Sequence, residues 1–434
     1  MSEWRSLSSI TSKIGSGSTP RGGNSVYSDS GISFIRSQNV LDMDFSTENL
    51  AFINDSQAEK LNNVIVEKND ILLNITGDSI ARCTVVPEEI LPARVNQHVS
   101  IIRCKNTEES KYVMYYLQYM KKYLLQISKV GGTRNALTKE AIGKLPIKIS
   151  DDCNKISKIL DNIDQKIQTN NQINQELEAM AKTLYDYWFV QFDFPDQNGK
   201  PYKSSGGKMV YHPELKREIP EGWGVTTFSS WISDNKTGDW GKETSQGNYT
   251  LEVDCIRGAD INGLSGNGKT DMPTRFILEK NKNKLLTDFD IVIEISGGSP
   301  TQSTGRIVGI SENVLNRFDL PLICSNFCKA VSLKEQETFY NFVYEWKNLY
   351  DNGVLFSWEG KTSGIKNLLF DSFVTNYHIA QPPIDLMKQF FDYASSVDKK
   401  TQLLLKQNQE LTQLRDWLLP MLMNGQVKVE NYTD

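Results

Sequence analysis

The chain repeats itself at a long and nearly constant interval, and this repeat limits its fold more than any other feature. Three segments return in the same order in the second half: Ser33–Val40 at Asp254–Ile261, Asp70–Gly77 at Asp290–Gly297, and Asn174–Leu177, unchanged, at Asn408–Leu411. The offsets lie between 220 and 234 residues, which is far too long for a solenoid repeat. We therefore expect a duplicated unit in which a globular domain is followed by a helix.

The globular part of each unit is predicted to mix strands and helices. Asp70–Ile75 and Asp290–Ile295 are short, apolar and rich in β-branched residues, as buried strands are, and both run into loops of glycine, serine and threonine. Tyr112–Ile127 and Thr338–Tyr350 have helical character. The pattern predicts the α+β fold class for both units.

A long helix is expected to close each unit. Apolar or interfacial residues recur at alternating steps of four and three, which is the a/d pattern of a coiled coil. In the first copy this seam consists of Ile156, Leu160, Ile163, Ile167, Asn170, Asn174, Leu177, Ala181, Leu184 and Trp188. The second copy is less regular and consists of Phe390, Ala394, Val397, Thr401, Leu404, Asn408, Leu411, Arg415, Leu418 and Leu422.

Asn174 and Asn408 hold equivalent positions in the two seams, where a buried asparagine costs stability but fixes register. The alternative is an amphipathic helix packed only on its own domain. Length argues against it, because about 35 residues at ~1.5 Å each span roughly 50 Å.

Composition excludes several classes of protein. The 434 residues contain no apolar run long enough for a membrane span and no apolar signal-peptide core near Met1, so a cytoplasmic location is expected. The six cysteines are scattered and only three histidines are present, so we expect free thiols and neither a metal nor a cofactor. The net charge of −5 argues against a lone high-affinity DNA binder, but it allows local patches or a partner that supplies positive charge.

One motif suggests phosphate chemistry. Gly263–Thr270 satisfies the P-loop pattern, in which Lys269 would contact phosphate. A P-loop follows a buried strand and opens a helix, whereas Arg257–Asn262 is not a strand end and Asp271–Pro273 delays any helix. A glycine-rich loop is the favoured interpretation, and a phosphate-binding enzyme that uses Lys269 remains the alternative.

No other catalytic pattern is convincing. An adenine methyltransferase would carry an Asn/Asp-Pro-Pro-aromatic loop, but Pro382-Pro383 is preceded by Gln381 and followed by Ile384. We therefore expect no catalytic residues.

Short motifs follow one another in a fixed order along nearly the whole chain. They are Trp4 with Gly17–Pro20, Phe34–Ser37, Asp70–Leu72 with Gly77, Leu137-Thr138 with Leu145-Pro146, Tyr185–Phe189, Phe192–Pro195, Gly199–Tyr202 and Ile219–Trp223. In these motifs and in the duplication, the chain resembles the specificity (S) subunits of type I restriction–modification systems, the HsdS family.

The resemblance implies an architecture and partners. Members of this family carry two target recognition domains, each of which reads one half of a bipartite, asymmetric site in double-stranded DNA. Two conserved helical regions form an antiparallel coiled coil that fixes the unread spacer. They also dock two modification (methyltransferase) subunits, through which the restriction and translocase subunits join. Segment Trp231–Tyr249 has no convincing counterpart in the first unit, so the two half-sites are expected to differ.

The expected domain boundaries follow the repeat and the turn-rich segment between its two copies. They are 1–150 for recognition domain 1, 151–191 for helical region 1, 192–223 for a linker, 224–384 for recognition domain 2, 385–425 for helical region 2 and 426–434 for a tail.

Loop residues that can bond base edges or phosphates are the candidates for DNA contact. In the first unit they are Thr19, Arg21, Arg36, Gln38, Asn39, Thr76, Ser79, Arg82, Thr133, Arg134 and Asn135. In the second unit they are Lys242, Thr244, Arg257, Asp260, Ser296, Ser299, Thr301, Gln302, Lys361, Thr362, Ser363 and Lys366. Arg36 and Arg257 are the strongest because they share a repeat position. The alternative is a solvated turn residue or, for the two arginines, a salt bridge within the domain.

The candidates for contact with partner subunits are aromatic and apolar residues near the ends of the helices, since such residues are enriched at interfaces. They are Tyr185, Trp188, Phe189, Trp417, Leu418 and Met421. Burial within the helix pair is the alternative for Trp188 and Leu418. A structural scaffold whose coiled coil only links subunits is a further alternative function.

Overall fold

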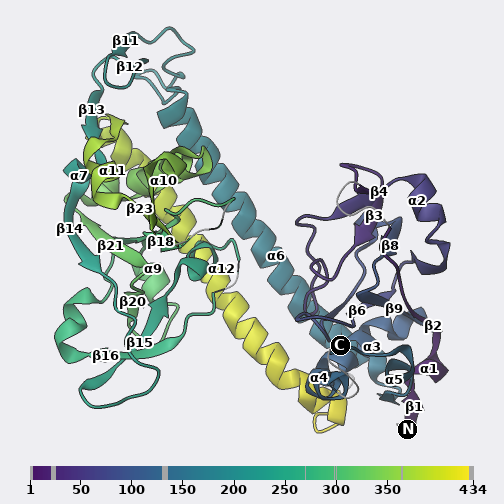
Figure 1. The fold of residues 1–434 in the computed structure, drawn as a ribbon. Coiled ribbons are helices and arrows are strands. Elements are labelled where there is room, and N and C mark those ends of the chain that lie inside the picture. Colours follow the sequence, from purple (N-terminus) through teal and green to yellow (C-terminus); the bar gives the residue numbers. More distant parts are fainter. Residues whose placement is uncertain are drawn as a thin grey trace, which may run out of the picture. The chain divides into compact units, whose positions relative to one another are not determined.

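The computed structural model divides the chain into two compact units (Figure 1). It describes residues 3–20, 26–129, 135–268, 270–297, 299, 301–362 and 365–429, without the side chains of 361 and 362. Unit 1 comprises Met1–Ile167 and Glu410–Asp434, and unit 2 comprises Gln168–Gln409. Helices α6 (Cys153–Tyr185) and α12 (Ile384–Asn424) therefore contribute residues to both units.

Unit 1 contains two four-stranded sheets and a two-stranded one. The first sheet is antiparallel and has the order β2 (Thr11–Ser16), β9 (Val99–Cys104), β6 (Ile71–Asn74) and β7 (Cys83–Val85). The second has the order β4 (Ala51–Ile53), β3 (Ile32–Ile35), β8 (Ala93–Val95) and β5 (Ile65–Val66), in which β3 and β8 are parallel. The remaining pair is β1 (Glu3–Ser6) with β10 (Pro146–Ile149).

Unit 2 repeats this topology except that its second sheet has three strands and lacks a counterpart of β5. Its antiparallel sheet has the order β14 (Ile232–Thr237), β21 (Cys328–Leu333), β17 (Asp290–Glu294) and β19 (Ile307–Ile310). Its second sheet has the order β16 (Thr274–Leu278), β15 (Tyr249–Ile256) and β20 (Leu322–Cys324), with β15 and β20 parallel, and β13 (Gly224–Thr227) pairs with β24 (His378–Gln381). The predicted mixture of helix and sheet is thus confirmed, and the two units share most of their strand order.

Unit 2 also contains two hairpins. One is β11 (Met209–His212) with β12 (Arg217–Pro220), within the predicted linker. The other is β22 (Glu359–Thr362) with β23 (Ile365–Leu368), which also pairs with β18 (Ser296–Gly297).

Short helices connect and cover the sheets. Unit 1 has α1 (Leu7–Ile10), α2 (Asp55–Glu59), α3 (Ser110–Tyr119), α4 (Lys121–Ser128) and α5 (Lys139–Gly143). Unit 2 has α7 (Phe228–Trp231), α8 (Ile261–Leu264), α9 (Glu312–Leu315), α10 (Phe339–Asp351) and α11 (Phe370–Asn376). Helices α3 and α10 are equivalent, and each packs its apolar face on the antiparallel sheet of its own unit.

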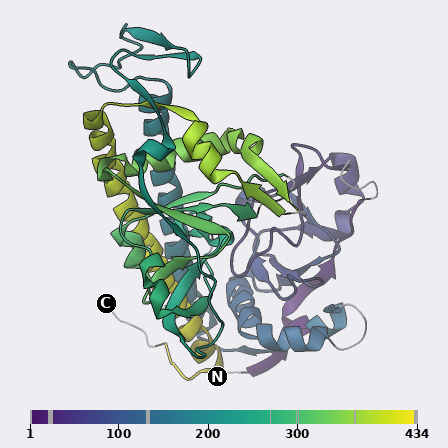
Figure 2. The same ribbon diagram turned by 60° about the vertical axis from the view of Figure 1, so that its left-hand side comes forward.

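Helices α6 and α12 pair in opposite directions within unit 2, where they lie side by side in both ribbon views (Figures 1 and 2). Near one end of this paired stretch, the Asn170 side-chain amide donates to Asn408 Oδ1 at 2.9 Å. Near the other end, the rings of Tyr185 and Phe390 lie 5.4 Å apart. Every position of the two predicted seams is buried or half-buried.

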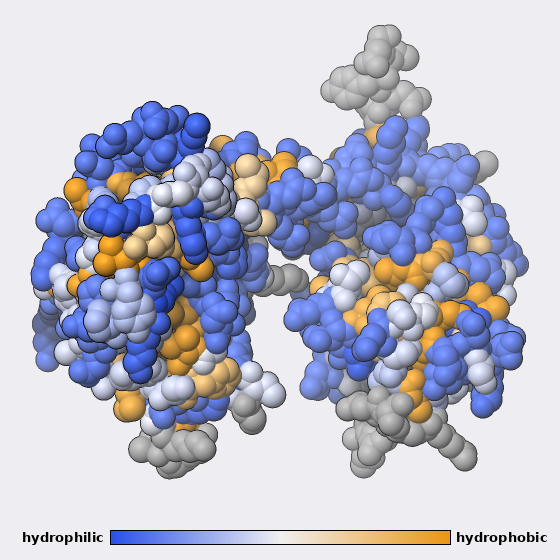
Figure 3. All heavy atoms as spheres, turned by 90° about the horizontal axis from the view of Figure 1, so that it is seen from above, coloured by the Kyte–Doolittle hydropathy of each residue, from blue (hydrophilic) through white to orange (hydrophobic). Residues whose placement is uncertain are grey.

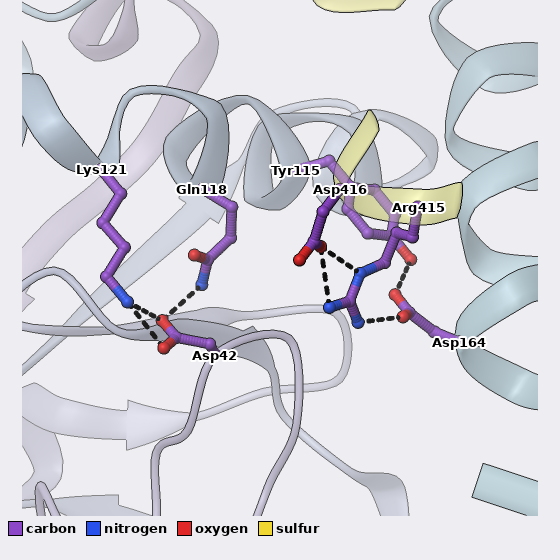
Figure 4. A network of polar contacts seen from close by, with 7 residues as sticks. All are labelled: Asp42, Tyr115, Gln118, Lys121, Asp164, Arg415 and Asp416. Atoms are coloured by element: carbon purple, nitrogen blue, oxygen red, sulfur yellow. Dashed lines mark hydrogen bonds and ion pairs between the residues drawn. The ribbon is translucent and has the colours of Figure 1, made fainter. Parts of the chain in front are cut away.

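An aspartate anchors a long helix to the globular part of each unit; the aspartate in unit 1 is buried and the one in unit 2 is half-buried. In unit 1, Asp164 on α6 accepts a hydrogen bond from Tyr115 Oη on α3 at 2.6 Å and forms an ion pair with Arg415 on α12 at 2.7 Å (Figure 4). The equivalent residue in unit 2 is Asp398 on α12, which accepts a hydrogen bond from Ser311 Oγ at 2.6 Å. Burial raises the pKa of both carboxyl groups above the ordinary aspartate value.

Polar residues dominate the surface, and apolar ones form smaller patches on the face drawn in Figure 3. Among the described helices, none combines the length and apolar composition needed to cross a membrane.

Candidate nucleic-acid interface

The loops that follow the strands of unit 1 gather into one cluster. We define the first loop cluster as residues 17–20, 36–39, 75–82, 96–98 and 135–137. Four backbone hydrogen bonds of 2.9–3.1 Å join its segments to one another and to the strand ends: Gly17 N to Asn96 O, Asn96 N to Ile35 O, Ile75 N to His98 O, and Leu137 N to Ile75 O. Because these bonds use the main chain, they hold the loops in place without fixing which side chains the loops carry.

Unit 2 builds an equivalent second loop cluster from residues 238–242, 257–260, 295–297, 299, 301–302, 325–327 and 366–368. Its backbone hydrogen bonds, each 2.9 Å long, run from Asp239 N to Cys324 O, Ser325 N to Ile256 O, Ile295 N to Phe327 O, and Leu368 N to Ile295 O. The last three reproduce bonds of the first loop cluster at equivalent positions. The two clusters are therefore the same scaffold, built twice.

A glycine holds the same place in both scaffolds. A Cβ atom on Gly17 would lie 1.7 Å from the carbonyl oxygen of Val95, and one on Gly238 would lie 1.9 Å from that of Ser325. Any side chain at these positions would collide with main-chain atoms. The glycine of the family-like segment Gly17–Pro20 is therefore required by a close approach between two loops.

The repeated arginines occupy equivalent turns with different partners. Arg36 Nη2 donates to the carbonyl oxygen of Asn49 at 2.6 Å, and its guanidinium lies 5.4 Å from the ring centroid of Tyr27. Arg257 instead forms a bidentate pair with Asp260, with bonds of 2.9 and 3.1 Å. The salt-bridge alternative therefore describes the local contacts of Arg257 but not those of Arg36.

Two candidates for DNA contact are buried inside these turns. Asn39 and Asp260 are almost fully buried, and their side-chain oxygens accept hydrogen bonds from the backbone N–H of Arg36 and Arg257, each 3.0 Å long. Burial opposes ionisation of Asp260, but the hydrogen bonds from Arg257 outweigh it and lower the pKa of this carboxyl. The prediction of base contact for Asn39 and Asp260 is corrected, because both side chains are used to close the turn.

The remaining candidates differ in exposure. Thr19, Gln38, Asn135, Lys242, Thr244, Thr301 and Gln302 are exposed, and Arg36, Thr76, Ser79, Arg82, Arg257, Ser296, Ser299 and Lys366 are half-buried. Arg21, Thr133, Arg134 and Ser363 lie outside the described residues, as do the side chains of Lys361 and Thr362. All the described candidates for DNA contact except Thr244 belong to a loop cluster. Thr244 lies two residues beyond segment 238–242 of the second loop cluster.

Sequence analysis missed one loop in each unit. In the first cluster the Thr19 hydroxyl donates to Gln97 Oε1, and the Thr76 hydroxyl is hydrogen-bonded to His98 Nδ1. In the second cluster the same place is held by Asn326 and Phe327, both exposed. Asn96–Val99 and Ser325–Cys328 share no residue, so the repeat gave no sign of them; only their place between two buried strands could have indicated a loop.

The P-loop interpretation does not agree with the order of elements. Helix α8 includes the first two residues of the glycine-rich segment, and strand β16 follows the segment, whereas in a P-loop a strand precedes the loop and a helix follows it. A Cβ on Gly266 would be in contact with Asn174 and Thr401, so this loop packs on the helix pair of unit 2. Lys269 itself lies outside the described residues.

Two residues predicted to contact partner subunits are core residues of unit 2. Tyr185 and Phe189 are buried, and both rings pack against Phe390 with centroids 5.4 Å away. Their prediction as partner contacts is corrected, because an aromatic cluster covers them. Of the other candidates, Trp188, Leu418 and Met421 are half-buried and Trp417 is 55% exposed.

The part of the chain that the structure describes contains no group of histidine, cysteine, aspartate and glutamate side chains that could hold a metal ion. The described side chains of the two clusters include hydrogen-bonding and cationic groups, the imidazole of His98 and the ring of Phe327.

The chain is similar in sequence and in fold to specificity subunits of type I restriction enzymes. The family profile described as Type I restriction modification DNA specificity domain matches residues 3–179. The Type I restriction enzyme MjaIX specificity subunit of Methanocaldococcus jannaschii is 25% identical over 352 residues, which cover 78% of this chain and 74% of that protein. The MjaVIII specificity subunit of the same organism is 24% identical over 385 residues, covering 85% and 81%.

A solved structure has a similar fold. It is the crystal structure of a Type-I restriction-modification system S subunit from M. genitalium, with a TM-score of 0.54, 14% identity, and coverage of 97% of this chain and 96% of that chain. The profile match and the two relatives support an assignment to the HsdS family, the specificity subunits of type I restriction–modification systems, and the solved structure supports the fold. The resemblance inferred from the motifs and the duplication is confirmed.

Proposed function

We propose that this specificity subunit reads a bipartite, asymmetric target in double-stranded DNA, with one loop cluster for each half-site. The observation that carries the proposal is the pair of equivalent backbone scaffolds that present different side chains. Equivalent scaffolds favour equivalent approaches to DNA, whereas different side chains favour different bases. A target with two unlike halves follows.

The proposed contacts are the exposed and half-buried residues of the two clusters. Arg36, Gln38 and Asn135 are the leading ones in the first cluster, and Gln302 and Lys366 in the second. Arginine suits guanine, and asparagine and glutamine suit adenine, because each can form two hydrogen bonds to the major-groove edge of that base. Asn39 and Asp260 hold the turns that position Arg36 and Arg257.

The paired helices have two proposed roles. As an antiparallel coiled coil, α6 and α12 would set the distance between domains 1–150 and 224–384. This distance would fix the length of the unread DNA spacer between the two half-sites. The same helices would dock two methyltransferase subunits. Trp417 is the most exposed of the proposed contacts with those subunits. With a net charge of −5, the chain depends on them for part of its affinity for phosphates. In this proposal it acts in the cytoplasm and has no catalytic activity of its own.

The test is to map adenine methylation in cells that carry this chain with its modification subunit. The expected result is a single bipartite, asymmetric motif that disappears when this chain is removed. Gln38→Ala should relax the sequence in one half of the motif only, and Gln302→Ala should relax the other half only. Gln336→Ala, at an exposed position outside both loop clusters and both long helices, is the matched control and should leave the motif unchanged.

The outcomes separate the alternatives. Methylation that keeps its full motif in both loop variants would contradict sequence reading by the clusters and would favour a scaffold. A nucleotide-dependent thermal shift that is lost in Lys269→Ala would instead favour the phosphate-binding alternative.

A further inference from the structure

Phe327 combines a fixed backbone with an exposed apolar ring. Its carbonyl oxygen accepts hydrogen bonds from Ile295 N and Ser296 N, at 2.9 and 3.1 Å, and the next residue, Cys328, is buried and bonded back to Ser325. Nevertheless 54% of Phe327 is exposed. Other aromatic residues of the same unit, such as Phe342, are buried in stacked contacts. A large ring held in water by a rigid loop is unfavourable unless a partner covers it.

The neighbours of Phe327 are polar. Asn326 beside it is exposed, and the Ser296 hydroxyl, on the segment bonded to the Phe327 carbonyl, donates to Asn367 Oδ1 at 2.7 Å. An apolar ring beside hydrogen-bonding groups matches the major-groove edge of a thymine–adenine pair. That edge carries the thymine C5-methyl group beside the thymine O4 and adenine N7 acceptors and the adenine N6 donor.

The equivalent position in the first cluster carries a different chemistry. His98 accepts the same backbone bond, from Ile75 N, but presents a half-buried imidazole that is hydrogen-bonded to Thr76. The scaffold is thus unchanged, while the presented group differs between an apolar ring and a polar one. This is the expected property of a position that determines specificity rather than stability.

We infer that Phe327 is a specificity-determining residue whose ring contacts the C5-methyl group of one thymine in the half-site read by the second loop cluster. The inference rests on the proposed function, because it assumes that this cluster faces DNA. To the proposed function it adds which base is contacted, which group of that base is contacted, and which residue makes the contact.

The test uses the complex of this chain with its modification subunits and duplexes that carry the mapped target. Each thymine of the half-site affected by Gln302→Ala is replaced in turn by deoxyuridine, which lacks only the methyl group. For the wild-type chain, one replacement should weaken binding by about fourfold, the value expected for loss of one buried methyl-sized group. In Phe327→Ala, the same replacement should have no effect.

Two further variants test whether Phe327→Ala acts only by disturbing the structure of the loop. Phe327→His places the residue of the equivalent position in the same loop, and it should bind thymine and deoxyuridine duplexes equally while keeping the other half of the motif. Gln336→Ala should show the same thymine preference as wild type.

Four results would overturn the inference. They are a half-site without thymine, no deoxyuridine effect in the wild-type complex, an effect that persists in Phe327→Ala, and loss of subunit assembly in Phe327 variants. The first three leave the proposed function standing if Gln38→Ala and Gln302→Ala still relax the motif. If those variants also keep the full motif, the proposed function itself fails.

Discussion

The ion pair between Asp164 and Arg415 allows the strongest prediction about stability. Figure 4 shows the pair. Asp164 is 8% exposed, and the Arg415 side chain is 13% exposed. We expect Asp164→Ala to destabilise unit 1, because among the described residues it leaves the mostly buried Arg415 guanidinium with Asp416, at 3.0 Å, as its remaining ion-pair partner. The same substitution deprives the Tyr115 hydroxyl of its acceptor.

The loss in the free energy of unfolding can be estimated from these contacts. Removing one partner of a buried ion pair costs about 3–5 kcal/mol, and we take about 3 because Asp416, itself mostly exposed, still offers partial neutralisation. The lost hydrogen bond of Tyr115 adds about 1 kcal/mol. The total of about 4 kcal/mol should lower the Tm of a domain the size of unit 1 by roughly 8–16 °C.

The assay must follow unit 1 separately, because two units need not unfold together. Hydrogen exchange of peptides from α3 and from the end of α12 reports on unit 1, and peptides from α10 serve as the internal control. Tyr115→Phe should cost only about 1 kcal/mol. The double variant Asp164→Leu/Arg415→Met should cost far less than Asp164→Ala, since an apolar replacement of both partners is often neutral. A double variant as unstable as the single one would refute the reasoning.

Three other substitutions have clear expected results. Asn174→Leu should stabilise unit 2 by about 1–2 kcal/mol in urea unfolding, because both polar atoms of this buried side chain lack a hydrogen-bond partner among the described residues; a loss of stability would contradict this. Gly17→Ala should abolish recognition of one half-site in methylation mapping because its Cβ would collide with Val95, whereas Gly15→Ala, two residues away in open space, should be neutral; equal effects would disprove the close-approach argument. Asp398 has a raised pKa, so its contribution to stability is present below the unfolded value near 3.8 and is lost as the pH rises through the folded value. Asp398→Asn should therefore gain stability relative to wild type over that interval, and a difference independent of pH would show that the raised pKa is absent.

The sequence predicted the parts of the fold that rest on periodicity and repetition. The seams of α6 and α12 follow from spacing alone, because a helix turn brings residues three and four apart onto one face. Strands β6 and β17 were predicted because both are short, buried and β-branched. Pairing between β3 and β8 was not predictable, since these parallel strands are joined by a long connection whose course depends on tertiary contacts.

The predictions from the sequence were wrong for residues whose type suits two different roles. Asn39 and Asp260 have the side chains of base readers, but the same short polar groups close turns by accepting a hydrogen bond from the main chain. Tyr185 and Phe189 have the aromatic rings of an interface and instead fill a core. Residue type cannot separate these roles, because the difference is burial, and burial is set by segments distant in the sequence.

His98 and Phe327 show why the most specific part of the candidate site could not be found from the repeat. Each accepts the bond from Ile75 N or Ile295 N through its carbonyl oxygen, so the scaffold places no demand on the side chain. A position that supports the loop through the main chain alone is free to change its side chain without loss of fold. If the two clusters read different bases, change at that position is also required. Repetition in the sequence therefore marks the scaffold, whereas discrimination between bases depends on the loop positions where the two copies differ.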